Sequence, residues 1–281
     1  MAAETKLNPD GYVHARDARE HQRLRNQARM WQAATEAALD AVGIGPAMSC
    51  LDVGSGTGAV MRLMANRVGP RGMVTGIDVD GLLGTQALAE LRAEGGAEFA
   101  FIQGNVLELG EVPGAPFNLT FCRLLLMHQP NPVAVLEEMH RWTKPGGTVM
   151  VQEFDFGAIS IEPTCPPMAE FNRLFEAVFR GYGRNLRAGR QLPAQFEAAG
   201  LGLPDHTKAA AHFLPLAEMA EMLIDVYDGL FASGAALGVA DTARATQFRQ
   251  DMRETAANGR YYCLPPILIS AWKQVSEPTE A

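Results

Sequence analysis

The sequence lacks several features that would assign it at once to a class of protein. Its 281 residues include four cysteines, and no two of them form a C-x-x-C pair. Scattered cysteines are typical of reduced, packed thiols, and they argue against a disulfide framework or a cysteine-based metal centre. We therefore expect no metal site.

The sequence also lacks an excess of basic residues and long apolar runs. The chain has 24 Lys and Arg against 32 Asp and Glu, a net charge of −8, which argues against nucleic acid as a partner because phosphate binding needs a basic surface. No apolar run reaches the roughly 18 residues of a membrane-spanning helix, and residues 1–6 lack the apolar core of a signal peptide. We expect a cytoplasmic protein that has no membrane partner, and composition leaves a homodimer open.

What the sequence does contain is an apolar run, an acid and three glycines within the eight residues Leu51–Gly58. Residues 48–53 predict a short buried strand, the following glycines predict a tight turn, and helical spacing begins at Ala59. A strand, a glycine turn and a helix N-terminus together form a nucleotide-type binding corner. The candidate binding residues in this stretch are Asp52, Gly54, Ser55, Gly56, Thr57 and Gly58.

Two acids indicate which nucleotide this corner binds. The glycine spacing alone also satisfies the G-x-G-x-x-G/A pattern of dinucleotide sites. However, the carboxylate of Asp52, just before the turn, would repel a pyrophosphate and attract an ammonium group. Asp78 ends the next predicted strand, about 20 residues beyond the glycines, where an acid that binds a ribose belongs. An amino-acid end and a ribose describe S-adenosylmethionine better than NAD.

With these motifs the chain resembles the class I S-adenosylmethionine-dependent methyltransferases, in the bacterial branch that acts on small secondary-metabolite or quinone-type molecules. Leu51–Gly58 matches the family's first motif and Gly76–Asp78 its second, while Leu136–Gly147 is similar to the helix and K-P-G-G turn before the fifth strand. The resemblance implies an enzyme that moves the methyl group of S-adenosylmethionine to a small apolar or aromatic metabolite.

The alternation of strand and helix patterns predicts an α/β fold, a doubly wound, Rossmann-like sheet of seven strands. The resemblance implies that the last strand is antiparallel. One long helix is expected over residues 17–42. The expected parts are an N-terminal helical segment (1–46), an α/β core (47–156, 190–213 and 261–275) and an inserted helical lid (157–189 and 214–260).

The resemblance also implies cofactor contacts outside the first motif and Asp78. They are Val79, Gly104, Asn105, Val106, Arg123, Tyr12, Arg23 and Gln27. Asn105 stands where the family usually has an acid, so it could meet the adenine edge without charge, but an Asn beside Gly is also typical of a turn. Arg23 and Gln27 lie one turn apart, which equally fits a solvated helix face.

Three residues are candidates for activating or aligning the methyl acceptor: His128, Glu153 and Tyr12. A histidine after the fourth strand can take a proton at neutral pH, and the alternative is that it only caps the next helix. Glu153, at the end of the fifth strand, is a candidate base or substrate anchor, or else a cap for the next segment.

Two other functions remain open on the sequence. An NAD(P)-dependent oxidoreductase fits the glycine spacing, but Asp52 and the lack of a Tyr-x-x-x-Lys pair oppose it. A non-methylating protein that binds S-adenosylmethionine is the second alternative.

Overall fold

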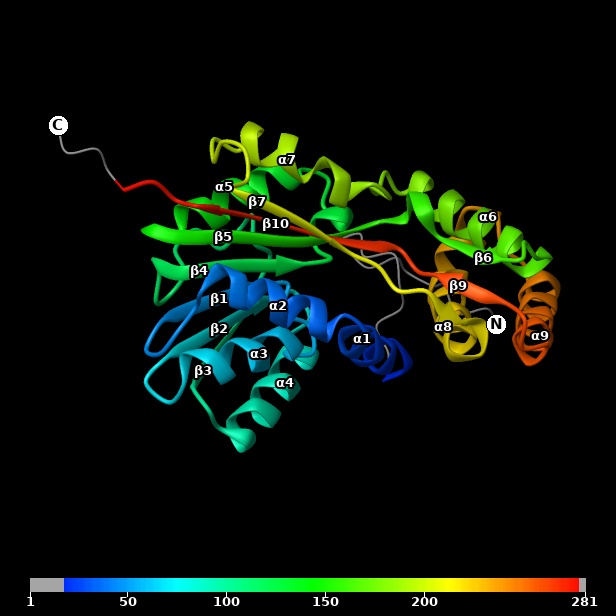
Figure 1. Ribbon diagram of the computed structural model, residues 1–281, viewed down its shortest axis with the longest axis horizontal. Helices are drawn as coiled ribbons and strands as arrows, with labels where there is room; N and C mark the ends of the chain where they lie inside the picture. The colour runs from blue at the N-terminus through cyan, green and yellow to red at the C-terminus, as the bar shows by residue number, and fades with distance from the viewer. Residues whose placement is uncertain (1–17, 278–281) are drawn as a thin grey trace. The chain divides into compact units, whose positions relative to one another are not determined.

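The computed structural model describes residues 18–277 and divides the chain into two compact units (Figure 1). Unit 1 comprises residues up to Gln27 together with Asp155–Arg187 and Ala211–Ile267. Unit 2 comprises Ala28–Phe154, Ala188–Ala210 and the chain from Leu268 onward. Each unit is described by itself.

Unit 2 contains a seven-stranded sheet in the order β3-β2-β1-β4-β5-β10-β7. Its strands are β1 (Ser49–Val53), β2 (Met73–Asp78), β3 (Glu98–Gln103), β4 (Phe117–Arg123), β5 (Thr143–Asp155), β7 (His206–Ala210) and β10 (Ile267–Gln274). Neighbours from β3 to β5 pair in parallel, whereas β10 and β7 are antiparallel. The predicted doubly wound, seven-stranded α/β fold is confirmed.

Helices cover both faces of this sheet, as its near-continuous apolar strands require. On one face lie α2 (Gln32–Val42), α3 (Ala59–Val68) and α4 (Gly81–Glu94), and on the other lie α5 (Pro132–Arg141) and α7 (Ala188–Ala198) (Figure 1). Strand alternation divides β1 between two cores: Leu51 and Val53 pack with α5 and α7, while Cys50 packs with α2 and α3.

The single helix expected over residues 17–42 is in fact two, α1 (Ala18–Met30) and α2. They meet at Trp31, which has φ −97° and ψ 6° and is 1% exposed. Its indole ring lies edge-on to Phe154, with ring centroids 5.5 Å apart. Burial of this large ring explains the interruption, which helical periodicity alone does not reveal.

Unit 1 contains helices α6 (Pro166–Gly181), α8 (Leu216–Ala236) and α9 (Thr242–Ala257). Phe171, Phe175 and Phe179 of α6 form stacked pairs, with ring centroids 5.5 and 4.4 Å apart. Asp228, within α8, forms salt bridges with both Arg19 and Arg249, each at 2.8 Å. These contacts link α1, α8 and α9 within the unit.

Besides the helices expected in residues 157–189 and 214–260, unit 1 contains a second sheet that the sequence did not predict. Its order is β6-β9-β8, with antiparallel pairs between β6 (Ser160–Glu162), β9 (Tyr262–Leu264) and β8 (Leu214–Pro215). Strands of two or three residues are too short to show a period of two in the sequence.

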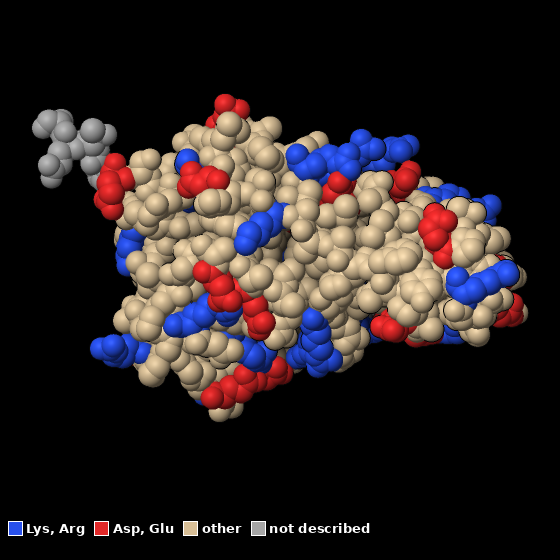
Figure 2. Space-filling view, in the orientation of Figure 1, with Lys and Arg blue, Asp and Glu red and all other residues tan. Residues whose placement is uncertain are grey.

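Within the part of the chain that the structure describes, no helix is both long and apolar enough to span a bilayer. On the face shown in Figure 2, Lys and Arg side chains are interspersed with Asp and Glu. Between Ala18 and Glu277 no three His, Cys, Asp or Glu side chains are grouped as metal ligands would be.

Candidate functional site

The predicted glycine corner lies at the carboxyl end of β1 in unit 2. The backbone N–H groups of Gly54 and Ser55 both donate to the carbonyl of Ile77, at 2.8 and 2.9 Å, which ties the turn to β2. Gly58 has φ +70° and is the N-cap of α3, and a Cβ there would lie 2.9 Å from Cδ1 of Leu91. Position 58 therefore requires glycine, both for its backbone conformation and for the packing of α4. Thr57, the residue before it, is half-buried.

Asp78 ends β2 beside this turn and holds it in place. One carboxylate oxygen accepts the N–H of Gly56 at 2.8 Å, and the other accepts the N–H of Asp80 at 2.9 Å. Asp80 in turn caps α4 by accepting from Leu83. An acid at the end of the second strand of such a sheet stands where the ribose of a nucleotide binds, and this role of Asp78 stays a prediction. The next residue, Val79, is half-buried.

Asp52 is a buried carboxylate without a hydrogen-bond donor. It is 2% exposed, and its Oδ2 accepts no hydrogen bond from any described residue. Burial raises its pKa to about 7, against the opposing influence of Arg123, and the charge of Asp78 raises it further. A buried acid in this state is poised to receive a cationic or hydrogen-bond-donating group of a ligand.

Arg123 ends β4, the strand that pairs with β1, so it lies at the point where the strand order reverses. Ligands of open α/β sheets bind in the crevice at such a switch point. Burial lowers the pKa of Arg123 to about 10, and Asp52 opposes this shift. Its Nη1 donates to the hydroxyl of Thr35 at 3.0 Å, which is its one hydrogen bond to the described chain.

The segment after β3 follows the turn interpretation. The Oδ1 atom of Asn105 accepts the N–H of Leu107 at 3.1 Å, and its Nδ2 donates to Glu108 at 3.0 Å. Both hydrogen bonds shape the local turn. Gly104 donates its N–H to the carbonyl of Asp78 at 2.9 Å, and Val106 is buried in the core. A direct adenine contact by Asn105 stays a prediction.

Glu153 is fully buried at the end of β5, where its Oε1 accepts the N–H of Leu126 at 2.5 Å. This bond anchors the 3-10 turn Leu126–His128 that follows β4. Burial raises the pKa of Glu153 to about 8, although backbone donors, Leu126 foremost, oppose the shift. Glu153 thus binds the turn after β4 and not the segment that follows β5, and its role as base or substrate anchor stays a prediction. His128 closes the anchored turn and is half-buried.

Three other predicted residues are not part of the described portion of unit 2. Arg23 belongs to unit 1, is 4% exposed, and binds Glu20 through two hydrogen bonds of 2.7 and 2.8 Å. Gln27, the last residue of that stretch of unit 1, is half-buried. Tyr12 lies outside the described residues. A cofactor role for these three stays a prediction.

Sequence reasoning missed two residues next to the site, Thr35 and Gln152. Both are fully buried, and the hydroxyl of Thr35 lies 2.7 Å from Oε1 of Gln152. The signal that could have found them is a polar residue in an apolar register: Gln152 interrupts an apolar strand, and Thr35 shares the buried face of α2 with Ala38.

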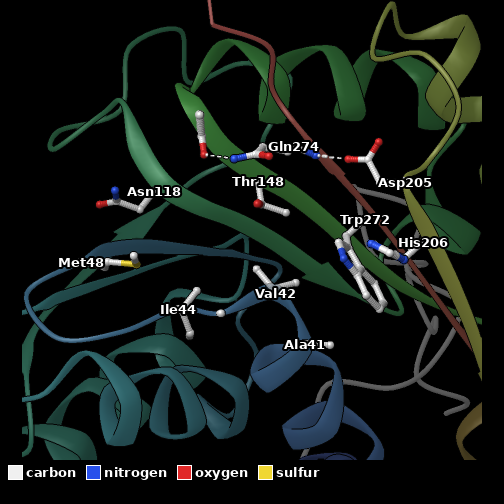
Figure 3. Close-up of a pocket in the computed structure, with 12 residues that line it drawn as sticks. Ala41, Val42, Ile44, Met48, Asn118, Thr148, Asp205, His206, Trp272 and Gln274 are labelled. Atoms are coloured by element: carbon white, nitrogen blue, oxygen red, sulfur yellow. Dashed lines mark hydrogen bonds between the residues drawn. The ribbon is translucent and has the colours of Figure 1, made fainter.

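A cavity of about 380 Å³ lies at the opposite, amino-terminal edge of the sheet (Figure 3). Trp272, His206 and Asn118 are among its lining residues, and none of the predicted site residues is. Three of its lining residues bind one another. Asp205 accepts the N–H of Gln274 at 2.9 Å, and the side chain of Gln274 donates to the carbonyl of Gly146 at 3.0 Å. The cavity is therefore separate from the glycine corner.

The sheet order, the glycine corner and the acid that ends β2 define a nucleotide-binding α/β protein of the class I methyltransferase type. A family model described as a methyltransferase domain matches residues 44–208, more than half of the chain. The chain belongs to this methyltransferase domain family, as the resemblance predicted.

Curated relatives match over part of their length. A demethylmenaquinone methyltransferase of Lactococcus lactis is 30% identical over 154 residues, 55% of this chain and 56% of the relative. A ubiquinone biosynthesis O-methyltransferase of Pseudomonas paraeruginosa is 35% identical over 104 residues, 36% of this chain and 42% of the relative. The chain thus spans about half the length of these relatives.

Solved structures share the fold. A putative methyltransferase of Bacillus halodurans matches with a TM-score of 0.59 at 16% identity, covering 87% of this chain and all of that one. A putative sarcosine dimethylglycine methyltransferase of Galdieria sulphuraria matches with a TM-score of 0.55 at 13% identity, covering 94% and 93% of the two chains.

Proposed function

We propose that the protein transfers the methyl group of S-adenosylmethionine to a small apolar or aromatic metabolite, with a quinol-type ring as the first acceptor class to test. The observation that carries the proposal is the buried Asp52 carboxylate, without a hydrogen-bond donor among the described residues, beside a glycine turn that Asp78 holds. The demethylmenaquinone and ubiquinone methyltransferases among the relatives support the acceptor class.

The binding residues divide between the two ends of the cofactor. Asp52 meets the ammonium of the methionine part, because a buried anion favours a cation. Asp78 binds the ribose hydroxyls, because it ends β2 beside the glycine turn that it fixes. A bound S-adenosylmethionine supplies a sulfonium methyl group, which an acceptor takes when the electron pair of the carbon–sulfur bond returns to sulfur.

For the acceptor, the protein provides position and a route for the proton. Holding two reactants in line accounts for much of the acceleration in such a transfer. His128 is the proposed base for a hydroxyl or amine acceptor, because it ends the turn that follows β4. Glu153 holds this turn by accepting the N–H of Leu126. That unit 1 acts as a lid stays a prediction.

Isothermal titration with S-adenosylmethionine, S-adenosylhomocysteine and NADH tests the cofactor. We expect both adenosyl ligands to bind and NADH not to, and binding of NADH alone would favour the oxidoreductase alternative. Incubation with methyl-labelled cofactor and a panel of quinols, phenols and amines then tests transfer. Tight cofactor binding with no labelled product from any acceptor class would favour a non-methylating binder.

A further inference from the structure

A chain of buried hydrogen bonds runs through unit 2 and ends at Arg123. The Nη1 atom of Arg123 donates to the hydroxyl of Thr35 at 3.0 Å, and this hydroxyl lies 2.7 Å from Oε1 of Gln152. The Nε2 atom of Gln152 then donates to the hydroxyl of Ser270 at 2.9 Å. Thr35 and Gln152 are fully buried and Ser270 is 5% exposed, so the chain links β4, α2, β5 and β10 inside the core.

The direction of donation along this chain follows from the chemistry of its first member. A guanidinium can only donate, so the Thr35 oxygen accepts from Arg123 and its own hydrogen is left for another acceptor. The Gln152 oxygen at 2.7 Å is nearer than the carbonyl of Trp31 at 3.1 Å. With its oxygen so engaged, the amide of Gln152 must turn its nitrogen to Ser270. The chain thus has one consistent set of hydrogen positions.

Arg123 itself is incompletely satisfied. Of its five N–H groups, one donates to Thr35, and no carboxylate among residues 18–277 forms an ion pair with it. A largely buried cation with open donors is stabilised by an anion with two oxygens, which matches the fork of a guanidinium. Asp52 lies on the paired strand β1, opposite Phe121, which is two residues before Arg123, and it presents the opposite need. Together the two side chains complement the ammonium and carboxylate of an amino acid.

We propose that Thr35 and Gln152 are positioning residues, which hold the Arg123 guanidinium so that its open N–H groups receive the carboxylate of the methionine part of the cofactor. The inference rests on the proposed function. Neither residue has surface through which to touch a ligand, so both act through Arg123. If Thr35 and Gln152 served only to pack the core, apolar residues of the same shape would fill these positions equally well.

The test compares S-adenosylhomocysteine with 5′-methylthioadenosine, which has the same nucleoside but lacks the amino-acid group. Titration calorimetry gives both affinities for the wild type, Thr35→Val and Thr35→Ser. Valine keeps the shape of threonine without its hydroxyl, and serine keeps the hydroxyl. We expect Thr35→Val to weaken S-adenosylhomocysteine on the order of tenfold and to leave 5′-methylthioadenosine unchanged, while Thr35→Ser retains wild-type affinities.

A double-mutant cycle with Arg123→Met tests whether the effect passes through the guanidinium. In that background Thr35→Val should cause no further loss. Equal weakening of both ligands, full affinity in Thr35→Val, or additive losses in the double variant would each overturn the inference. If a thermal melt shows that Thr35→Val is unfolded, Gln152→Met takes its place and is judged by the same ratio of the two affinities. A wild type that binds neither ligand would instead refute the proposed function.

Discussion

We predict that cofactor binding releases a proton from Asp52, as follows if Asp52 binds the ammonium group as proposed. Burial raises its pKa to about 7, so the free protein carries about half a proton on this group at pH 7. An ammonium group about 4 Å away, at an effective dielectric constant of about 20, contributes about 4 kcal/mol. That energy corresponds to a fall of about three pKa units. The carboxyl is therefore ionised in the complex.

Binding of S-adenosylhomocysteine should thus release about half a proton at pH 7, nearly one at pH 6 and about a tenth at pH 8. The assay is calorimetry at each pH in two buffers with different ionisation enthalpies, since the difference in heat reports the protons released. Asp52→Asn, which cannot titrate, should release none. Glu153→Gln is the matched control, because Glu153 is also a buried acid with a raised pKa yet binds the turn after β4. It should keep the release.

Two results would refute this reasoning. Heats that agree between the two buffers at pH 7 would show that Asp52 does not change its protonation on binding. Undiminished release in Asp52→Asn, with loss of release in Glu153→Gln, would assign the proton to the other acid. A thermal melt of each variant checks that the comparison is made between folded proteins.

The remaining predictions concern three positions. Asp78→Ala should weaken S-adenosylhomocysteine by about 10- to 100-fold in calorimetry, because the turn and the ribose both lose a carboxylate. Asp80→Ala, which removes the cap of α4 and leaves the Asp78 carboxylate in place, should leave affinity near wild type. An unaffected Asp78→Ala would disprove the ribose role. His128→Ala should lower turnover at unchanged cofactor affinity, whereas full activity would restrict His128 to a structural role. Glu153→Gln should flatten the pH dependence of stability, since a pKa raised from 4.5 to about 8 stabilises the fold below pH 4.5 and loses that contribution as pH rises to 8; parallel melting curves from pH 5 to 8 would contradict this.

The sequence predicted the sheet and the glycine corner because their determinants are local. Apolar runs mark β1 and β2, and the backbone conformation at Gly58 admits few other residues. The roles of single polar residues were harder to predict from the sequence, because they depend on partners that are far away along the chain. Glu153 binds Leu126, 27 positions earlier, and Thr35 meets Gln152, 117 positions later.

The same distinction explains two features that the sequence did not predict, the second sheet in unit 1 and the helix break in unit 2. Its second sheet pairs strands of three residues or fewer, and pairing at that length depends on neighbours brought together by tertiary structure. The break at Trp31 likewise depends on Phe154, which meets its ring from a distant strand. Helical periodicity continued through that position, so the sequence offered no sign of the interruption.

The buried carboxyl group of Asp52 also lowers the stability of the free protein. A rise of about three units in the pKa of Asp52 corresponds to about 4 kcal/mol that the free protein forgoes at pH 7 and above. A core under selection for stability alone would place an apolar residue at this position of β1. The sheet tolerates the acid because Leu51 and Val53 on either side are fully packed. A ligand that brings the missing ammonium recovers part of this energy, so affinity for it is built into the free fold.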